Sequence, residues 1–199
     1  SRGLGDVYKR QGLIALFEGD KPFTTKLDGF FTNTDSMGEE ASSDITGLIG
    51  QYAHGNEPSH HVAYLYAYAG EQWKTAEKVR FIMSDFYTDQ PDGIIGNEDC
   101  GQMSAWYVLT ACGIHPVCPG ETRFEITTPL FDHIVIQVGK GKTFTIQVRN
   151  NSPENVYIQS ARLNGKTYTK CHIDYQEIIA GGALEIEVGA APNQEWGIN

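Results

Sequence analysis

The chain changes from helical to strand periodicity near Pro116, and this change constrains its fold more than any other feature. Before Pro116, apolar residues recur at helical spacing, whereas the residues after it form alternating, β-branched runs such as HIVIQV and TFTIQV. Helices followed by strands in this segregated order are typical of α+β folds or of two packed modules. We therefore predict a helical part over 12–115 and a small antiparallel β module over 116–199.

Glycines and prolines divide both parts into short elements. In the helical part, the predicted helices cover 12–18, 21–31, 43–55, 56–70, 71–87 and 101–113. Ser43 or Asp44 is a plausible N-cap of the third helix, and Asn56 can cap the fourth. In the β module, we expect a four-residue hairpin connection at 139–142, a type I′ turn at 164–165 and a last strand over 183–188.

The composition limits the classes of partner. The 199 residues carry a formal net charge of −10, which argues against nucleic acid as the main partner and is compatible with sugar or a bound cation. No apolar run approaches the roughly 20 residues that a membrane span needs. Cys112 and Cys118 are close enough in sequence for a disulfide, with buried free thiols as the alternative.

The first eleven residues, SRGLGDVYKRQ, resemble a translated sequencing adaptor. The alternative is an ordinary polar segment at the start of the chain. If the first interpretation is right, natural sequence begins near Gly12, and the lack of a signal peptide says nothing about the compartment.

Three polar clusters lie at loop-to-helix junctions of the helical part: GEE at 38–40, HGNEPSHH at 54–61 and PDGIIGNEDCGQ at 91–102. In the second cluster, the simplest interpretation is that Asn56 caps a helix and that the histidines lie on the surface. That interpretation gives no reason for three histidines to gather there. The arrangement is not HExxH, and an amide carbonyl beside a carboxylate suits calcium better than zinc. In the third cluster, Asp99 could simply cap the following helix. Adjacent carboxylates also repel one another unless compensated, so a catalytic or metal carboxylate is the functional alternative.

Several stretches together resemble the C-terminal part of the α-mannosidases of glycoside hydrolase family 92. They are DITGLIGQYAHGNEPSHHVAYLYAYAGEQWKT, PDGIIGNEDCGQMSAWYVLTACGIHPVCPG, TPLF, NVYIQSARLNG and PNQEWG. The resemblance implies an N-terminal β-sandwich joined to an (α/α)6 barrel, of which this chain would supply some helical hairpins. It also implies an exo-acting, calcium-dependent, inverting enzyme that removes mannose from N-glycans and related mannosides in the periplasm or outside the cell.

The resemblance also implies residue roles. Asp99 matches the general base, and Asn97 stands where some relatives carry a second Asp. Asn56 and Glu57 resemble part of the calcium site. The predicted substrate-binding residues are Glu40, His60, His61 and Gln102.

The family's general acid is a Glu in an EGN…WQY-type motif, which this chain does not contain. We therefore expect a piece of a longer enzyme that lacks the acid, the sandwich and the first barrel helices and is inactive alone. Uncovered apolar faces are expected at a set of early helical residues, namely Leu13, Ile14, Leu16 and Phe17. The alternatives are a non-catalytic carbohydrate-binding module, with Trp73 or Trp106 stacked on sugar rather than in the core, and a purely structural α+β domain.

Overall fold

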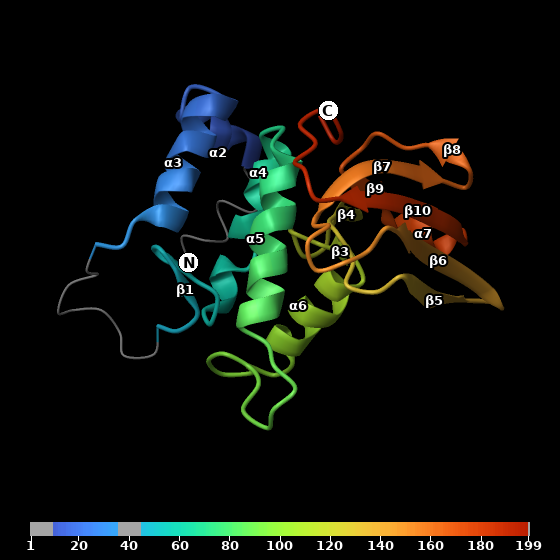
Figure 1. Cartoon of the computed structure of the whole chain (residues 1–199), viewed down its shortest axis with the longest axis horizontal. Helices are drawn as coiled ribbons and strands as arrows, with labels where there is room; N and C mark the ends of the chain where they lie inside the picture. Colours follow the sequence, from blue (N-terminus) through green and yellow to red (C-terminus); the bar gives the residue numbers. More distant parts are fainter. Residues whose placement is uncertain (1–9, 36–44, 199) are drawn as a thin grey trace.

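Helices and strands occupy opposite sides of the molecule in the computed structural model, which describes residues 10–35 and 45–198 (Figure 1). The helical side comprises α2 (Arg10–Leu16), α3 (Asp20–Thr32), β1 (Leu48–Ile49), β2 (Tyr52–Ala53), η1 (Glu57–Ser59), η2 (Val62–Tyr64), α4 (Leu65–Tyr68), α5 (Gln72–Asp85) and α6 (Gln102–Ala111). The strand side comprises β3 (Ile114–His115), β4 (Arg123–Ile126), β5 (His133–Gly139), β6 (Lys142–Arg149), β7 (Tyr157–Leu163), β8 (Lys166–Thr167), β9 (His172–Asp174), α7 (Tyr175–Ile179) and β10 (Gly182–Gly189). The predicted α+β class is confirmed.

The first described helix has a mixed environment. Helix α2 begins at Arg10, so the predicted boundary at residue 11 falls inside this helix. Leu16 is 82% exposed, whereas Ile14 is only 5% exposed and belongs to the helical core. Leu13 and Phe17 are partly buried against the same core. The expectation of an uncovered apolar face therefore holds at Leu16 and is wrong at Ile14.

A hairpin replaces the helix that was predicted over 43–55. Strands β1 and β2 pair antiparallel, and the His54 amide donates to the Gly47 carbonyl oxygen at 2.9 Å to extend the ladder. Gly50 has a φ of 60° in the turn, and a Cβ there would lie 2.5 Å from the backbone carbon of Phe31. The close packing of this turn on α3 excludes the helix. The two N-caps considered for it, Ser43 and Asp44, lie outside the described residues.

The segment predicted as one helix over 56–70 consists instead of two 3₁₀ turns, η1 and η2, followed by the short α4. Asn56 occupies the predicted N-cap position, at the start of η1, with φ −113° and ψ 104°, but its side chain makes no capping hydrogen bond. The tighter turns accompany the burial of His60 and His61, which are 3% and 7% exposed. The interpretation of these histidines as surface residues is therefore wrong.

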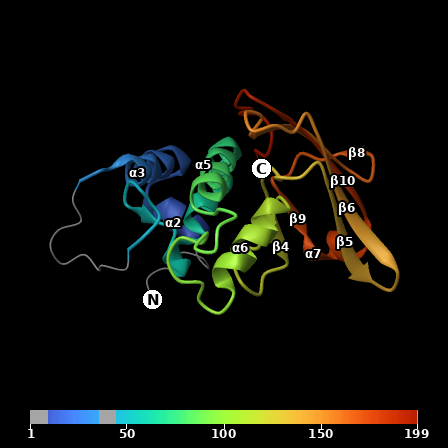
Figure 2. The same ribbon diagram turned by 60° about the horizontal axis from the view of Figure 1, so that its bottom comes forward.

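The strands form a five-stranded sheet of order β5-β6-β10-β7-β8 and a three-stranded sheet of order β3-β4-β9 (Figure 2). The other strand pairings in both sheets are antiparallel, as predicted, but β10 enters between β6 and β7 and runs parallel to β6. A parallel neighbour requires a crossover, which the segment from β7 through α7 provides.

The two hairpin turns of the five-stranded sheet follow local sequence. Asn164 and Gly165 have φ values of 51° and 77°, as the predicted type I′ turn requires. The first hairpin turns more tightly than predicted, because β5 ends at Gly139 and β6 begins at Lys142.

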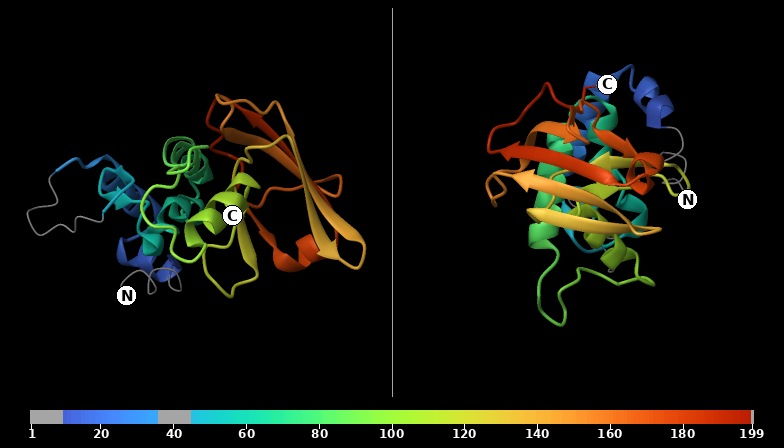
Figure 3. Two further views of the ribbon diagram at one scale, coloured as in Figure 1. Left: turned by 90° about the horizontal axis from the view of Figure 1, so that it is seen from below. Right: turned by 90° about the vertical axis from the view of Figure 1, so that its right-hand side faces the viewer.

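Each side of the molecule has its own apolar core. Helix α5, green in the ribbon, lies between the other helices and the strands (Figure 3). Gln72 at its start donates to the Ile126 carbonyl oxygen at 3.1 Å, and Glu77 accepts from the Tyr157 hydroxyl at 3.2 Å. Arg80 donates to the Pro129 carbonyl oxygen at 3.0 Å. These bonds hold α5 against β4, the loop that follows β4, and β7. Cys112 and Cys118 are both reduced thiols, so the disulfide considered for them is not formed.

Candidate functional site

His54 lies at the centre of a buried aromatic cluster beneath the candidate site. Its ring is fully buried, with centroids 4.5 Å from the ring of His60 and 4.4 Å from that of Trp106. The hydroxyl of Tyr87 donates to the Met103 carbonyl oxygen, so it accepts from Nε2 of His54 at 2.8 Å. Nδ1 of His54 then accepts from the Tyr52 hydroxyl at 2.9 Å. The cluster thus specifies one neutral tautomer of His54.

Hydrogen bonds also specify the tautomer of His60, which lies between this cluster and the candidate site. Its Nε2 donates to the His54 carbonyl oxygen at 3.0 Å, and its Nδ1 faces the amide nitrogen of Gln102 at 3.4 Å. Burial lowers the pKa of His60 to about 4. Burial likewise lowers the pKa of His54 and of His115 to about 3. His54, His60 and His115 are therefore neutral at physiological pH.

A cavity of about 440 Å³ opens above these rings, within the range of ~300–1,000 Å³ that small-molecule sites occupy. One face of α6 supplies Gln102, Ala105, Trp106 and Leu109 at i, i+3, i+4 and i+7. The remaining lining comes from Glu57, Pro58, His60, His61, His115, Pro116, Val117 and Pro119. Four residues predicted from the sequence, namely Glu57, His60, His61 and Gln102, therefore meet in one cavity.

Three buried polar atoms of this cavity have no hydrogen-bond partner among the described residues: Oε1 of Glu57, Nε1 of Trp106 and Nδ1 of His115. A buried polar atom left without a partner costs about 1–3 kcal/mol. Such atoms are normally satisfied by water, an ion or a ligand. Their gathering in one cavity with an apolar lining is the arrangement expected of a binding site for a polar ligand.

Asn56 and Glu57, the predicted calcium ligands, lie at the start of η1. The carboxylate of Glu57 offers its unpartnered Oε1 in the cavity, whereas Asn56 is exposed and does not line the cavity. A buried carboxylate oxygen with no donor fits a hard cation.

Asp99 occupies a backbone turn at the mouth of α6. Asp99, Cys100 and Gly101 have consecutive positive φ values of 48°, 58° and 94°, a conformation that costs energy at the two non-glycine positions. Asp99 is exposed and does not line the cavity, but its carbonyl oxygen accepts from the amide of Gln102, which does. Asn97 is exposed on the same loop. The turn therefore presents the Asp99 side chain to solvent one helical turn from the cavity.

Glu98, not Asp99, caps helix α6. Its carboxylate accepts hydrogen bonds from the backbone amides of Gly101 and Ser104, the latter at 3.1 Å. Hydrogen bonds from Ser104, the largest contribution, lower the pKa of the Glu98 carboxyl. The alternative in which Asp99 merely caps the helix is therefore wrong, and Asp99 remains available for another role.

Some residues fall outside this site, and others join it. Glu40, predicted to bind substrate, lies outside the described residues. A larger cavity of about 1050 Å³ lies along α3 and contains no predicted site residue.

Trp106, considered as either core or sugar platform, is 1% exposed and also lines the site cavity. His115 was not predicted. The sequence did contain a signal for it. His115 follows a predicted helix whose spacing places Gln102 and Trp106 on one face.

Comparison with known proteins supplies the family. Residues 7–190 match the glycosyl hydrolase family 92 catalytic domain. The chain belongs to glycoside hydrolase family 92. Its structure resembles that of a family GH92 α-mannosidase from Bacteroides thetaiotaomicron in complex with mannoimidazole, with 39% identity and a TM-score of 0.86 over 91% of this chain and 24% of that chain. It also resembles a family GH92 inverting mannosidase from the same organism, with 33% identity and a TM-score of 0.85 over 99% of this chain and 28% of that chain.

A curated relative from Arthroderma benhamiae (strain ATCC MYA-4681 / CBS 112371), named an uncharacterized secreted glycosidase, is 36% identical over 146 residues. That match covers 72% of this chain and 19% of the relative. This family 92 chain therefore spans between 19% and 28% of the length of these relatives. Among the described residues, no helix combines the length and apolar character needed to cross a membrane.

Proposed function

We propose that this family 92 chain forms part of a calcium-dependent, inverting exo-α-mannosidase that releases terminal mannose from N-glycans or related mannosides. The observation that carries the proposal is the cavity in which Glu57, His60, His61 and Gln102 meet with three unpartnered buried polar atoms. One solved relative is described as an α-mannosidase in complex with mannoimidazole, and another as an inverting mannosidase.

Glu57 would hold the calcium ion, together with the backbone or side chain of Asn56 and oxygens from outside the described residues. The unpartnered Oε1 of Glu57 supports this role. Calcium takes six to eight oxygen ligands at ~2.3–2.6 Å, so Glu57 and Asn56 would supply only part of the set. When bound, the ion would engage vicinal hydroxyls of mannose and favour a flattened ring.

His60, His61, Gln102 and Trp106 would position the sugar. Because Nε2 of His60 is used by the His54 carbonyl oxygen, Nδ1 of the neutral ring is the acceptor that faces the Gln102 amide. The Gln102 side chain is exposed beside it and can exchange this weak contact for a sugar hydroxyl. The Nε1 of Trp106 is an indole donor without a partner among the described residues, and it would complete the polar contacts.

Asp99 would act as the general base. Inversion requires one carboxylate that activates water and a carboxylic acid roughly 6.5–9.5 Å away that protonates the leaving oxygen. Asp99 is exposed to water on a strained turn at the mouth of α6, while its neighbour Glu98 is occupied with capping. Asn97 would lie beside the base as a hydrogen-bonding neighbour. The family's general acid belongs to an EGN…WQY-type motif that this sequence does not contain, so we assign the acid to a part of the enzyme outside this chain.

The complete enzyme would contain an N-terminal β-sandwich and an (α/α)6 barrel, to which 12–115 contributes helical hairpins and 116–199 the β module. The relative named as secreted supports a periplasmic or extracellular location. The 199-residue chain alone would then turn over mannosides too slowly to measure, because losing general-acid catalysis costs about 10²–10⁴-fold.

Hydrolysis of an aryl α-mannoside by the full-length enzyme tests the proposal against the alternative of a non-catalytic carbohydrate-binding module. We expect turnover that yields β-mannose as the first product, as inversion demands. Mannoside binding without turnover would instead establish the binding module, and first release of α-mannose would exclude the inverting assignment.

A further inference from the structure

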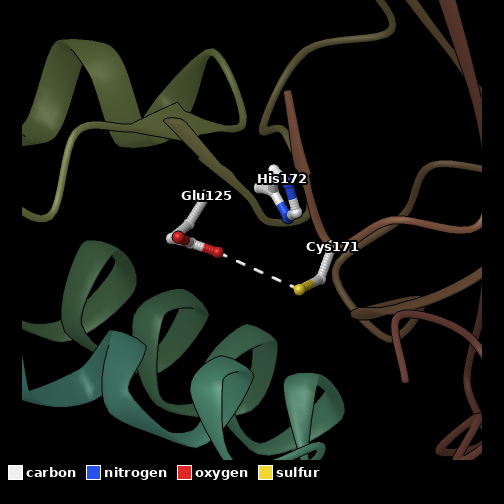
Figure 4. A group of neighbouring side chains, drawn as sticks. All are labelled: Glu125, Cys171 and His172. Carbon is white, nitrogen blue, oxygen red and sulfur yellow. Dashed lines mark hydrogen bonds between the residues drawn. The ribbon is translucent and has the colours of Figure 1, made fainter. Parts of the chain in front are cut away.

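Glu125, Cys171 and His172 form a compact cluster on the strand side, and none of them lines the candidate mannose cavity (Figure 4). Glu125 lies in β4 and is paired in register with His172 in β9, while Cys171 directly precedes β9. One potential ligand atom from each residue lies within 4.8 Å of the others. The pairing of two strands thus brings a carboxylate, a thiol and an imidazole to one point.

We propose that these three side chains bind one transition-metal ion, with zinc as the preferred metal. Thiolate, imidazole and carboxylate together are a zinc ligand set, whereas calcium takes oxygen ligands. The Glu125 carboxylate oxygen Oε2 and the Cys171 sulfur are 4.0 Å apart. Around a tetrahedral zinc with bonds of about 2.0–2.3 Å, neighbouring ligand atoms lie roughly 3.5 Å apart, so movements of under about 1 Å suffice. Water would take the fourth position.

The burial of these side chains and an unpartnered imidazole nitrogen support this metal site. Glu125 and Cys171 are 0% and 1% exposed. Nδ1 of His172 is buried and has no hydrogen-bond partner among the described residues. Few polar atoms in a folded protein are left in that state, and an ion is one of the ordinary explanations. The metal would then satisfy an imidazole nitrogen that the protein itself leaves unsatisfied.

Arg123 is the charged neighbour with which the metal must coexist. Its guanidinium donates to both Glu125 oxygens, at 2.5 and 3.1 Å, and lies over the ring of Tyr68, with its Cζ 4.5 Å from the ring centroid. A carboxylate has about four lone-pair sites, so these two bonds leave acceptor capacity for a metal. The Arg123 side chain is 30% exposed, which keeps its charge in contact with solvent. Arg123 can therefore remain in place as an outer partner of the ligating carboxylate.

Binding would form a metal–sulfur bond and break the S–H bond of Cys171, whose proton leaves to solvent. The thiolate and the Glu125 carboxylate together balance the 2+ charge of the ion. Apparent affinity should therefore increase with pH, as it does when a thiol is deprotonated by a metal. The sulfur of Cys171 also lies 3.8 Å from the Ala67 carbonyl oxygen in α4, so the ion would sit where the helical and strand sides meet.

Cobalt(II) titration of the chelator-treated chain tests the site directly, because a thiolate ligand produces a charge-transfer band in the near ultraviolet. We expect one equivalent to bind, with loss of the band in Cys171→Ser and retention in Cys100→Ser, whose cysteine is exposed. With zinc at a hundredfold excess over its Kd, the melting temperature should rise by about 5–10 °C.

His172→Gln keeps the cysteine and provides a second test if Cys171→Ser does not fold. We expect its cobalt affinity to fall at least tenfold, at an apo melting temperature close to that of the parent. The proposal is overturned if the parent shows no charge-transfer band, if the band survives in Cys171→Ser, or if His172→Gln binds cobalt as tightly as the parent.

Discussion

His54 and His60 are stacked, with ring centroids 4.5 Å apart and an interplanar angle of 22°, and Nε2 of His60 donates to the carbonyl oxygen of His54. This pair connects the aromatic cluster of the helical core to the candidate mannose cavity. Neither imidazole can gain a proton without placing charge next to the other ring in a buried environment. Both rings are therefore neutral at physiological pH.

Acid should unfold the protein through these buried histidines. Burial holds the pKa of His54 and His115 at about 3 and that of His60 at about 4. The unfolded chain binds protons near pH 6.5. Stability is therefore complete above about pH 6.5 and is lost as the pH falls toward 4, by about 1.4 kcal/mol per pH unit for each histidine. Urea unfolding at pH 7, 6 and 5, followed by circular dichroism, measures this slope.

Two variants separate these histidines from other titrating groups. His115→Phe keeps a ring that can stack on Tyr64 and should reduce the slope by about a third. His133→Gln changes an exposed histidine of β5 and should leave the slope unchanged. Equal slopes in both variants would exclude the histidine explanation.

Tyr87→Phe should destabilise the fold by about 1–3 kcal/mol. The hydroxyl of Tyr87 accepts from His54 and donates to the Met103 carbonyl oxygen, so its removal leaves a buried donor unpaired. Tyr107→Phe is the matched control, because Tyr107 packs on Tyr87 with ring centroids 4.7 Å apart and its hydroxyl makes no hydrogen bond to a described residue. Thermal or urea unfolding compares the two. A loss in Tyr107→Phe as large as in Tyr87→Phe would show that packing, and not the hydroxyl, matters.

Gly50→Ala should destabilise the β1–β2 hairpin by more than its positive φ alone requires. Gly50 combines a φ of 60° with a Cβ position 2.5 Å from the Phe31 backbone. Gly120 has a φ of 89° and nothing within 4 Å of its Cβ position, so Gly120→Ala measures conformational strain alone, about 1–2 kcal/mol. We expect the larger loss of unfolding free energy in Gly50→Ala. Equal losses would contradict the close approach of this turn to α3.

The elements that were predicted correctly depend on neighbours in sequence. The Asn164–Gly165 turn has the positive φ pair that this dipeptide favours, and the alternation in β5 and β6 identifies both strands. The β1–β2 hairpin depends instead on the contact between Gly50 and Phe31, which periodicity cannot reveal. The parallel pairing of β10 with β6 depends on which neighbour the last strand meets after a long crossover.

The site residues likewise fall into those that local sequence motifs predict and those that depend on tertiary structure. The family motifs predicted Glu57, His60, His61 and Gln102 as site residues, and all four line the cavity. The capping role of Glu98 was not predicted, because the left-handed turn at Asp99 and Cys100 decides which of two adjacent carboxylates reaches the helix amides. His115 comes from β3 and reaches the cavity only through tertiary packing.

Asp99→Asn and Glu98→Gln should affect different properties of the full-length enzyme, namely catalysis and stability. Asp99→Asn removes the proposed base and should lower kcat by about 10²–10⁴-fold while the melting temperature stays the same. Glu98→Gln replaces the charged cap of α6 and should lower the melting temperature with a smaller loss of kcat. Kinetics with an aryl α-mannoside and thermal melting of both variants check this. If Asp99→Asn kept near-full activity, Glu98 and Asp92 would be the next candidates for the base.

The calcium dependence of mannoside hydrolysis by the full-length enzyme, measured for the parent and for Glu57→Gln, tests the central claim most directly. Glu57→Gln keeps the shape of a side chain whose buried Oε1 has no partner among the described residues, but it weakens a ligand for a hard cation. Glu121→Gln changes a carboxylate outside the cavity lining and serves as the control. We predict that chelation abolishes activity, that calcium restores it in the parent and in Glu121→Gln, and that Glu57→Gln needs at least tenfold more calcium. Full activity after chelation, or the same calcium requirement in Glu57→Gln as in the parent, would contradict the account.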